Sequence, residues 1–202
     1  MVNKGKRSSI SRLLRQMVKK HQDDSSLTYG ALVKDLGDQA YGLILVLFAL
    51  PSALPISVIP GFSFIFGLPI VFIAIHIIIG HPSLWLPNSL AKQVVDIKKL
   101  ARVIDKTIPY LMYVERFLKP RWPFFSSPVM ERLHGVVLLG LSLLLLLPIP
   151  FSNFIFASLI ILFGLGLSER DGAVLGFAYF GSLLYGFFLV SLARGLLSFL
   201  FV

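Results

Sequence analysis

The chain has 202 residues, of which 56% are hydrophobic and only 14% are charged, and its formal net charge is +9. Soluble domains carry about 25% charged residues, and a soluble core of this size could not enclose such long apolar runs. Lipid is the solvent that these runs need, so the sequence predicts an all-α integral membrane protein. The absence of cysteine excludes disulfides, thiolate nucleophiles and cysteine-bound metals. The basic residues lie beside apolar runs, which favours membrane-flanking charge over nucleic-acid binding.

The first region, residues 1–39, is polar and basic. It contains a predicted amphipathic helix with apolar residues on one side and basic residues on the other; the apolar ones are Ile10, Leu13, Leu14, Met17 and Val18. Such a helix either lies on an anionic inner leaflet or docks on another cytoplasmic helix. The first strongly apolar run begins near Tyr41, too late for the hydrophobic part of a secretory signal. Insertion into a cytoplasmic-type membrane is therefore expected, rather than export.

Residues 40–80 form the first predicted membrane hairpin. The apolar block is too long for one span of about 20 residues. It contains three prolines within ten residues, a density that a continuous helix does not tolerate; the residues of this break are Pro51, Pro55, Pro60 and Gly61. The pattern predicts a helix over 41–50, an irregular stretch, and a second helix over about 62–79.

Residues 81–133 form a predicted cytoplasmic or interfacial helical linker. Apolar residues recur from Leu90 to Ile108 with a period of 3.5, which is typical of a helix that packs on a partner helix in the same chain or in a second copy. A further helix is predicted up to Lys119, in which Glu115 and Lys119 would form an i,i+4 pair. Arg116 and Arg121 are candidate ligands for the phosphate of an anionic lipid or a lipid-linked glycan.

Residues 134–168 form the second predicted hairpin, which is broken by Pro148 and Pro150. Residues 169–202 contain a polar loop and a last transmembrane helix over about 173–193. Ala178, Ser182 and Gly186 recur at every fourth position of that helix. A face of small residues permits close packing of helices in lipid. Together with the 3.5-residue seam of the linker, it makes a homodimer the expected oligomer.

The two hairpins align with each other. When Gly42 is set on Gly135, Pro55 falls on Pro148 without a gap, and three extra residues in the first copy then set Ile70 on Ile160. The matched breaks predict that the hairpins are copies of one internal repeat. Each break is either irregular backbone within the membrane, held against protein or water as in transporters, or a turn at the far surface. Broken hairpins are the favoured interpretation.

The distribution of Lys and Arg predicts the topology. Residues 1–39 contain eight of them and residues 81–133 contain nine, whereas the two hairpin tips contain none. Both basic regions are therefore expected in the cytoplasm. Each hairpin then returns to the side from which it entered, the repeats are parallel, and the last helix places the C-terminus outside. A complete re-entrant loop over residues 41–59 would reverse this assignment.

Few polar groups accompany the apolar segments. The loop residues Glu169, Arg170 and Asp171 could bind an ion or a headgroup, or form a polar loop in which Asp171 caps the last helix. His76 lies within an apolar helix, where it is a functional candidate or a hydrogen-bonding group between two helices. Asn153 could pair the carbonyl groups that the second break leaves free. The sequence contains no catalytic constellation, so we expect no enzyme, no metal and no cofactor.

Several short motifs occur in a fixed order along the chain, and they are "LGDQAYG" at 36–42, "GHPSLWLP" at 80–87, "ERFLKPRW" at 115–122, "LPIPFSN" at 147–153 and "LSERDG" at 167–172. This ordered set resembles the exopolysaccharide synthesis ExoD family of bacterial membrane proteins. The chain departs from that family's usual pattern at Gln39, Ser52 and His76. The resemblance implies a role in exopolysaccharide production at the inner membrane, which is a process rather than a reaction.

Three functions remain open at this point. The first is a small transporter, channel-like or lipid-handling protein, and the second is a non-catalytic scaffold or assembly factor for exopolysaccharide machinery. The weakest is a membrane enzyme that acts through Glu169 or Asp171 on a lipid-linked sugar. A hydrophilic path should bring His76 and Asn153 together at a cavity with Ser57 and Ser63, whereas a scaffold should not.

Overall fold

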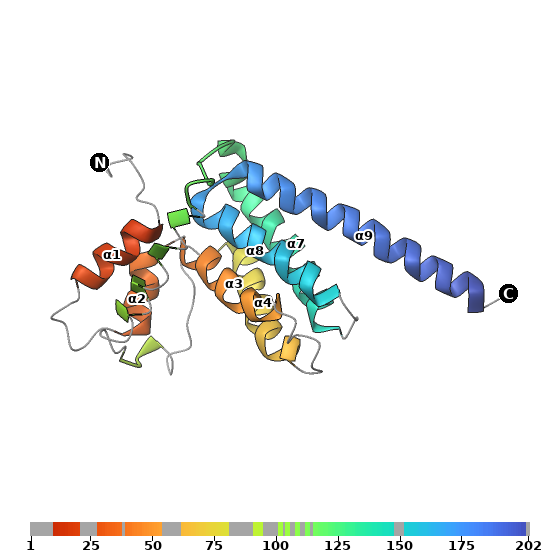
Figure 1. Cartoon of the computed structure of the whole chain (residues 1–202), viewed down its shortest axis with the longest axis horizontal. Helices are drawn as coiled ribbons and strands as arrows, with labels where there is room; N and C mark the ends of the chain where they lie inside the picture. Colours follow the sequence, from red (N-terminus) through yellow and green to blue (C-terminus); the bar gives the residue numbers. More distant parts are fainter. Residues whose placement is uncertain are drawn as a thin grey trace.

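The computed structural model describes most of the chain, namely residues 10–20, 28–37, 39–53, 62–80, 91–94, 101–102, 104–105, 108–109, 112–113, 115–147 and 152–200. Its named elements are the α-helices α1 (Ile10–Lys20), α2 (Tyr29–Leu36), α3 (Gln39–Ser52), α4 (Phe62–Ile79), α7 (Pro128–Leu146), α8 (Ser152–Glu169) and α9 (Gly172–Leu200), and the 3₁₀ helix η2 (Pro123–Ser126) (Figure 1). Over these residues the protein is helical and has no strand, which confirms the predicted all-α class.

Three helices, α7, α8 and the Gly172–Gly195 part of α9, are long and apolar enough to cross a membrane. With 19 and 18 residues, α7 and α8 are about 29 Å and 27 Å long at 1.5 Å per residue. This length is close to the ~30 Å of a bilayer's hydrocarbon core. The three helices fit the multi-pass membrane protein that the composition predicts.

Two glycines set how the hairpin arms pair. Helix α3 packs along α8, and α4 packs along α7. A Cβ atom on Gly42 of α3 would collide with Ser168 and with the carbonyl of Gly164 on α8, and a Cβ on Gly135 of α7 would lie 2.9 Å from the backbone nitrogen of Ile78 on α4. Only glycine permits backbones to approach this closely.

The same contacts show that both pairs run antiparallel. Gly42 lies near the start of α3 and meets the end of α8, whereas Gly135 lies in the first half of α7 and meets the end of α4. The starts of α3 and α7 and the ends of α4 and α8 therefore share one end of the bundle, which we call the polar end. The opposite end, where α3 and α7 finish, is the break end.

The centre of the bundle is filled with apolar side chains. Its largest buried members are at most 1% exposed, and they are Leu45, Ile70, Leu138, Leu145, Phe156, Ile160 and Phe163. Because lipid is as apolar as these side chains, their packing stabilises the bundle mainly through dispersion contacts. Among the described residues of the bundle, the buried polar side chains are few, and they are Ser52, His134, Ser142, Ser152 and Ser168.

Helix α9 uses only part of its length for packing. A Cβ on Gly181 would lie 2.7 Å from Leu159 of α8, and Leu175 lies against Gly166. Only 11% of its apolar window is buried, compared with 50% for α8. Figure 1 shows α9 extending well past the bundle. The helix has 29 residues and ends at Leu200, later than the predicted 193.

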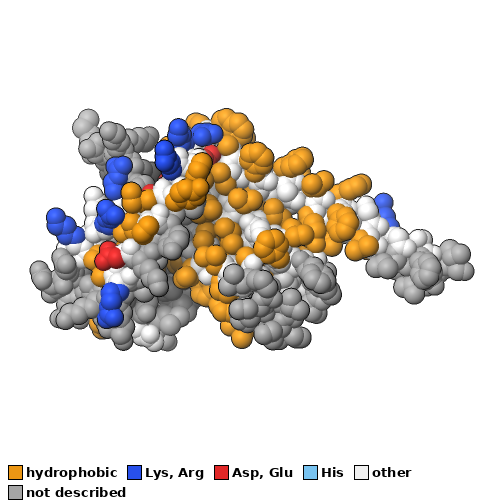
Figure 2. Space-filling view, viewed as in Figure 1, with side chains coloured by type: hydrophobic (Ala, Val, Ile, Leu, Met, Phe, Trp, Pro, Cys, Tyr) orange, Lys and Arg blue, Asp and Glu red, His pale blue; other side chains and the backbone are white. Residues whose placement is uncertain are grey.

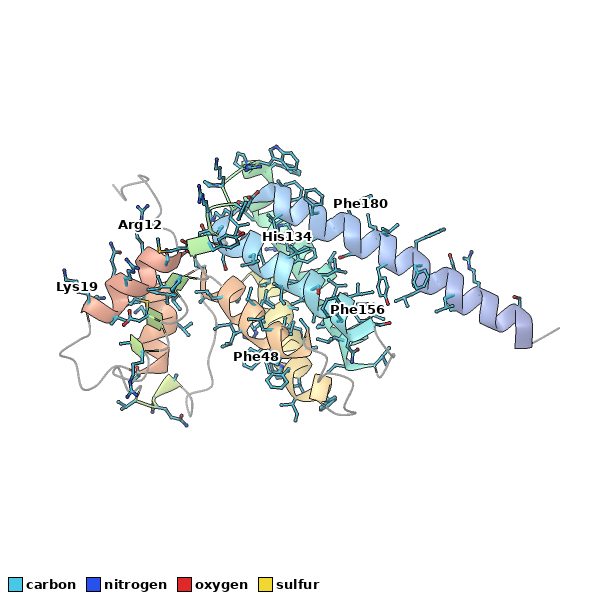
Figure 3. The ribbon with its side chains drawn as sticks, viewed as in Figure 1. Arg12, Lys19, Phe48, His134, Phe156 and Phe180 are labelled. Atoms are coloured by element: carbon cyan, nitrogen blue, oxygen red, sulfur yellow. The ribbon has the colours of Figure 1, made fainter. Side chains whose placement is uncertain are left out.

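Helix α1 docks on the rest of the chain instead of presenting its apolar side to lipid. Met17 is buried with Val33 and Leu36 of α2 and with Ala40 of α3. The basic side chains of α1, such as Arg12 and Lys19, lie on its exposed side (Figure 3). Of the two arrangements that the sequence left open, these contacts are those of docking on another helix. The cytoplasmic location of both helices stays a prediction.

The prediction for the linker was partly wrong. Val94 is 61% exposed and forms an isolated antiparallel bridge with Thr28, so the helix predicted from residue 90 to 108 is not present at Val94. Ile104 and Ile108 are buried within their own chain, while Leu90 and Ile97 lie outside the described residues. Two described seam residues, Ile104 and Ile108, are thus covered within their own chain, whereas Val94 is exposed. The role of the seam as a subunit interface stays a prediction.

The first helix break begins later than predicted, because Pro51, a predicted break residue, lies inside α3. Helix α3 ends at Ser52, one residue after Pro51, and α4 begins at Phe62. The remaining break residues, Pro55, Pro60, Gly61, Pro148 and Pro150, lie outside the described residues.

Candidate functional site

The polar end brings together two segments that are far apart in the sequence. The amide of Gly172 donates a hydrogen bond to the carbonyl of Arg121 over 2.9 Å, and Arg121 forms a parallel bridge with Asp171. On the face shown in Figure 2, Lys and Arg side chains gather over this region and over α1 and α2, whereas hydrophobic side chains cover the helices beyond. The charged motifs of the linker and of the loop after α8 therefore form one surface.

Asp171 has a structural role. It is only 1% exposed, and its carboxylate accepts hydrogen bonds from the backbone amides of Ala173 (3.0 Å) and Lys119 (2.9 Å). The first bond caps α9, as predicted from the sequence, because a carboxylate satisfies free amides at a helix N-terminus. The second bond was not predicted, and it holds Lys119, which lies outside any helix. The predicted helix therefore ends before Lys119.

Glu115 also acts on a helix N-terminus. Its two carboxylate oxygens accept hydrogen bonds from the backbone amide and the hydroxyl of Ser11, both at 2.6 Å. The predicted i,i+4 pair with Lys119 is replaced by this contact, which caps the first turn of α1. Arg116 and Arg121 are exposed beside it. Their binding to phosphate stays a prediction.

Arg170 has a backbone conformation that is rare for its residue type. Its φ is 52°, in the left-handed region, and the amide of Asp171 donates to the carbonyl of Gly166 over 2.9 Å to close the end of α8. Glycine usually occupies such a helix end, and another residue costs about 1 kcal/mol there. Arg170 therefore occupies a position at the charged polar end where a side chain carries a backbone cost.

A cavity of about 150 Å³ opens at the polar end beside Arg170. Six helices and the residues directly after two of them supply its lining, which consists of Tyr41 of α3, Ile77 of α4 and Gly80 just after it, Phe125 and Ser126 of η2, Glu131 of α7, Gly166 and Leu167 of α8, Arg170 just after α8, and Leu175 of α9. The volume far exceeds the ~10–15 Å³ that a single water needs. Apolar side chains and two opposite charges thus share one cavity at the end of the membrane helices.

His134 belongs to this region and was missed by sequence reasoning. It is fully buried; its Nε2 donates to the carbonyl of Phe125 (2.9 Å), and its Nδ1 lies 2.6 Å from the hydroxyl of Tyr179. Because a carbonyl can only accept, Nε2 carries the hydrogen, and in the neutral ring Nδ1 accepts from Tyr179. The ring also stacks on Phe125, a cavity residue, with 3° between the planes. Figure 3 shows His134 between α7 and α9.

The other predicted polar residues do not gather at the cavity. His76 lies on α4, where its Nδ1 is 2.8 Å from the carbonyl of Phe72, so this contact is within one helix and not across a helix pair. Asn153 lies in the first turn of α8, at the break end. Glu169 is the last residue of α8, next to Arg170 but not in the cavity lining. Ser57 and the side chain of Ser63 lie outside the described residues.

Comparison with known proteins identifies the family. The family model "Exopolysaccharide synthesis, ExoD" matches residues 10–191, from α1 into α9. The chain is 34% identical over 155 residues to an uncharacterized protein of Synechocystis sp., which covers 76% of this chain and 73% of that one. It is 30% identical to Protein ExoD of Rhizobium meliloti over an alignment of 160 residues. This alignment covers 77% of this chain and 66% of the relative. No solved structure matches the chain. The chain belongs to the ExoD family, which is linked to exopolysaccharide synthesis.

Proposed function

We propose that this protein is a lipid-handling component of exopolysaccharide synthesis in the bacterial inner membrane, and not an enzyme. In this proposal the cavity at the polar end holds the phosphate headgroup of an anionic lipid or of a lipid-linked glycan. The observation that carries it is the position of Arg170, whose side chain lines an amphiphilic cavity where the membrane helices end.

The chemistry of the cavity fits such a headgroup. A guanidinium group binds phosphate oxygens through two parallel hydrogen bonds. Ile77, Leu167 and Leu175 provide apolar surface for the first carbons of a lipid chain. Glu131 lines the same cavity, and its carboxylate would favour a headgroup that also offers an amine or hydroxyl donor over bare phosphate. Both ends of an amphiphile thus have complementary groups here.

The proposed orientation places the polar end in the cytoplasm. The two basic regions, residues 1–39 and 81–133, contain 17 of the 19 Lys and Arg residues, eight in the first and nine in the second. Positive charge is retained on the cytoplasmic side of bacterial inner membranes. The headgroups that reach the cavity would then come from the inner leaflet.

The bundle is proposed to be a duplicated hairpin, and the glycine contacts support this. Gly42 and Gly135 are equivalent in the alignment of the two hairpins. Gly42 meets positions 164 and 168 of α8, and Gly135 meets positions 74 and 78 of α4. These partners differ by 90 residues, which is also the offset that sets Ile70 on Ile160. Equivalent residues thus make equivalent contacts in both halves.

A channel through the bundle is the less favoured form of this function, because the centre of the described bundle is apolar. The scaffold alternative has one supporting observation. Helix α1 is clasped by Glu115 through Ser11 and exposes a basic side that an acidic partner could engage. A scaffold would not need Arg170 for its function. The lipid-retention experiment described next, which replaces Arg170, therefore separates the two functions.

The test measures lipid retention by the full chain in detergent, using native mass spectrometry. The probes are a phosphatidylglycerol, a phosphatidylcholine and a short polyprenyl phosphate. Because a hydrogen bond to a charged group contributes about 1.5–3 kcal/mol, Arg170→Gln should lower retention of a phosphate lipid about tenfold or more. The probe lipid whose retention falls most in Arg170→Gln identifies the source of the headgroup.

Two further variants make this test specific. Arg194→Gln removes an exposed charge on the distal part of α9, and retention should stay at the wild-type level. Arg170→Gly should lower retention as much as Arg170→Gln while relieving the left-handed backbone by about 1 kcal/mol. Equal retention by wild type and both Arg170 variants would contradict the proposal.

A further inference from the structure

Exposed aromatic side chains are concentrated in the segment that leads into α7. They are 59% to 68% exposed, and we call them the aromatic belt; they are Tyr113, Phe117, Trp122 and Phe124. None of the four lines the cavity. Rings left in water lose the favourable transfer of their apolar surface. An exposed group of this kind therefore marks a contact surface.

The belt is held at the polar end by contacts on both of its halves. Tyr113 and Phe117 pack edge to face with their ring centroids 5.4 Å apart. Trp122 and Phe124 each contact the ring of Phe125, with centroid distances of 6.2 Å and 6.1 Å. The backbone between the halves is tied to the start of α9 by the hydrogen bond from Gly172 to Arg121. The belt thus lies where the membrane helices begin and end.

Positive charge is interleaved with the belt. Residues 112–124 contain three cations, all of them exposed, namely Arg116, Lys119 and Arg121. The carboxylate in these residues is Glu115, which accepts two hydrogen bonds from Ser11. Figure 2 shows Lys and Arg side chains directly beside hydrophobic ones at this end of the molecule. The surface therefore offers aromatic rings and cations together.

The exposed apolar surface continues from the belt onto α7. Val129, Leu133 and Val136 are 76%, 44% and 53% exposed, and their spacing of four and three residues places them on one face of the helix. Helix α7 is long and apolar enough to cross a membrane. Once the helix is inserted, a face that the rest of the chain leaves exposed meets lipid. The belt extends this lipid-facing surface to the depth of the headgroups.

We infer that the aromatic belt rests among anionic lipid headgroups at the polar end and sets the depth of the bundle there. A lipid surface is the favoured occupant because aromatic rings concentrate at the headgroup level of membrane proteins. Cations beside them attract anionic lipids. A protein partner is less favoured, since the belt continues the lipid-facing side of α7. The inference goes beyond headgroup binding in the cavity and uses none of the charged residues of its lining.

The two tryptophans of the chain permit a test of depth. In vesicles that contain phosphatidylglycerol, Trp85→Phe leaves Trp122 as the fluorophore. Lipids with bromine near the headgroup should quench its emission more than lipids with bromine near the chain ends. Val136→Trp, in a chain with both natural tryptophans replaced by phenylalanine, is the control near the middle of α7, at a similar exposure of 53%. It should show the reverse order.

The depth measurement has two outcomes that overturn the inference. One is that neither brominated lipid quenches Trp122 while Val136→Trp is quenched, which would place the belt in water. The other is that neither position is quenched, which would place the whole bundle outside the bilayer.

A second measurement tests the charge of the belt. Phosphatidylglycerol brominated near the headgroup should quench Trp122 at least about threefold more than phosphatidylcholine brominated at the same place. One triple variant should abolish this preference, and it combines Arg116→Gln, Lys119→Gln and Arg121→Gln. The control triple variant makes the same change in net charge at exposed positions of α1, α2 and α9, and it should keep the preference; it combines Lys19→Gln, Lys34→Gln and Arg194→Gln.

Equal quenching by the two lipids, or a preference that survives the first triple variant, would overturn the binding of anionic headgroups by the belt. Arg170 is unchanged in all of these proteins. The outcome is therefore distinguishable from that of the retention test, in which Arg170 is replaced and the belt is intact.

Discussion

His134 and Tyr179 link α7 to α9 by a hydrogen bond of 2.6 Å in a buried site beside the cavity. Neither residue forms a recognisable motif, because they are 45 positions apart and each lies within an apolar run. The pair holds Phe125 in place through the ring stacking and through the bond to its carbonyl. The shape of the cavity therefore depends on a contact that does not itself touch the proposed ligand.

A double-mutant cycle would measure this contact. His134→Phe and Tyr179→Phe should each lower the free energy of unfolding by about 1–3 kcal/mol, because each leaves a buried polar partner unsatisfied. The double variant should lose less free energy of unfolding than the two single variants lose together, since it leaves fewer buried polar groups unpaired. Reversible unfolding in mixed micelles provides the energies. Strict additivity would mean that the two side chains act separately.

The charged residues of the polar end show what local sequence could predict. The capping of α9 by Asp171 was predictable because donor and acceptor are two residues apart. The bond from Ser11 to Glu115 spans 104 residues, and nothing in the local pattern indicates it. The left-handed backbone at Arg170 was also missed, since glycine is the residue type that usually marks such a position.

At the level of elements, the apolar runs predicted the positions of α3, α4 and α8, whereas α7 begins at Pro128, before the predicted start of the second hairpin at residue 134. Proline breaks and polar loops bound α3, α4, α7 and α8, and these signals lie within the segments themselves. The helix predicted in the linker was partly wrong, because a period of 3.5 residues indicates a packed helix but does not identify the helix on which it packs. At Val94 the contact with Thr28 prevailed over the local pattern. The cavity could not be predicted, since six separate elements supply its lining.

The close approach of the helix pairs gives a prediction at this scale. Gly42→Ala should destabilise the bundle by about 3 kcal/mol, the upper part of the usual cost of overpacking, because the added methyl group meets the backbone of Gly164. Gly140→Ala lies on α7 with open space around it and should be stabilising by up to about 1 kcal/mol. Thermal unfolding in detergent compares the two. If Gly42→Ala and Gly140→Ala changed the stability equally, the close crossing of α3 and α8 would not contribute to the stability of the bundle.

For the whole molecule, the separation of charge from apolar surface makes the orientation testable. Lys119→Cys lies at the polar end, and Ser198→Cys lies near the end of α9. In intact spheroplasts a membrane-impermeant maleimide should label Ser198→Cys, and it should label Lys119→Cys only after permeabilisation. The cysteine-free wild type provides the background. The reverse labelling pattern would place the polar end outside.

The unequal lengths of the helices have a consequence for the surrounding lipid. Helix α3 has 14 residues and α9 has 29, which correspond to about 21 Å and 43 Å of helix. Hydrocarbon of about 30 Å must thin beside the shorter helix, while the longer one tilts. For a membrane-inserted bundle this mismatch predicts a tapered annulus of lipid whose thinnest part lies beside α3. Such a taper favours sorting of the protein to thinner membranes.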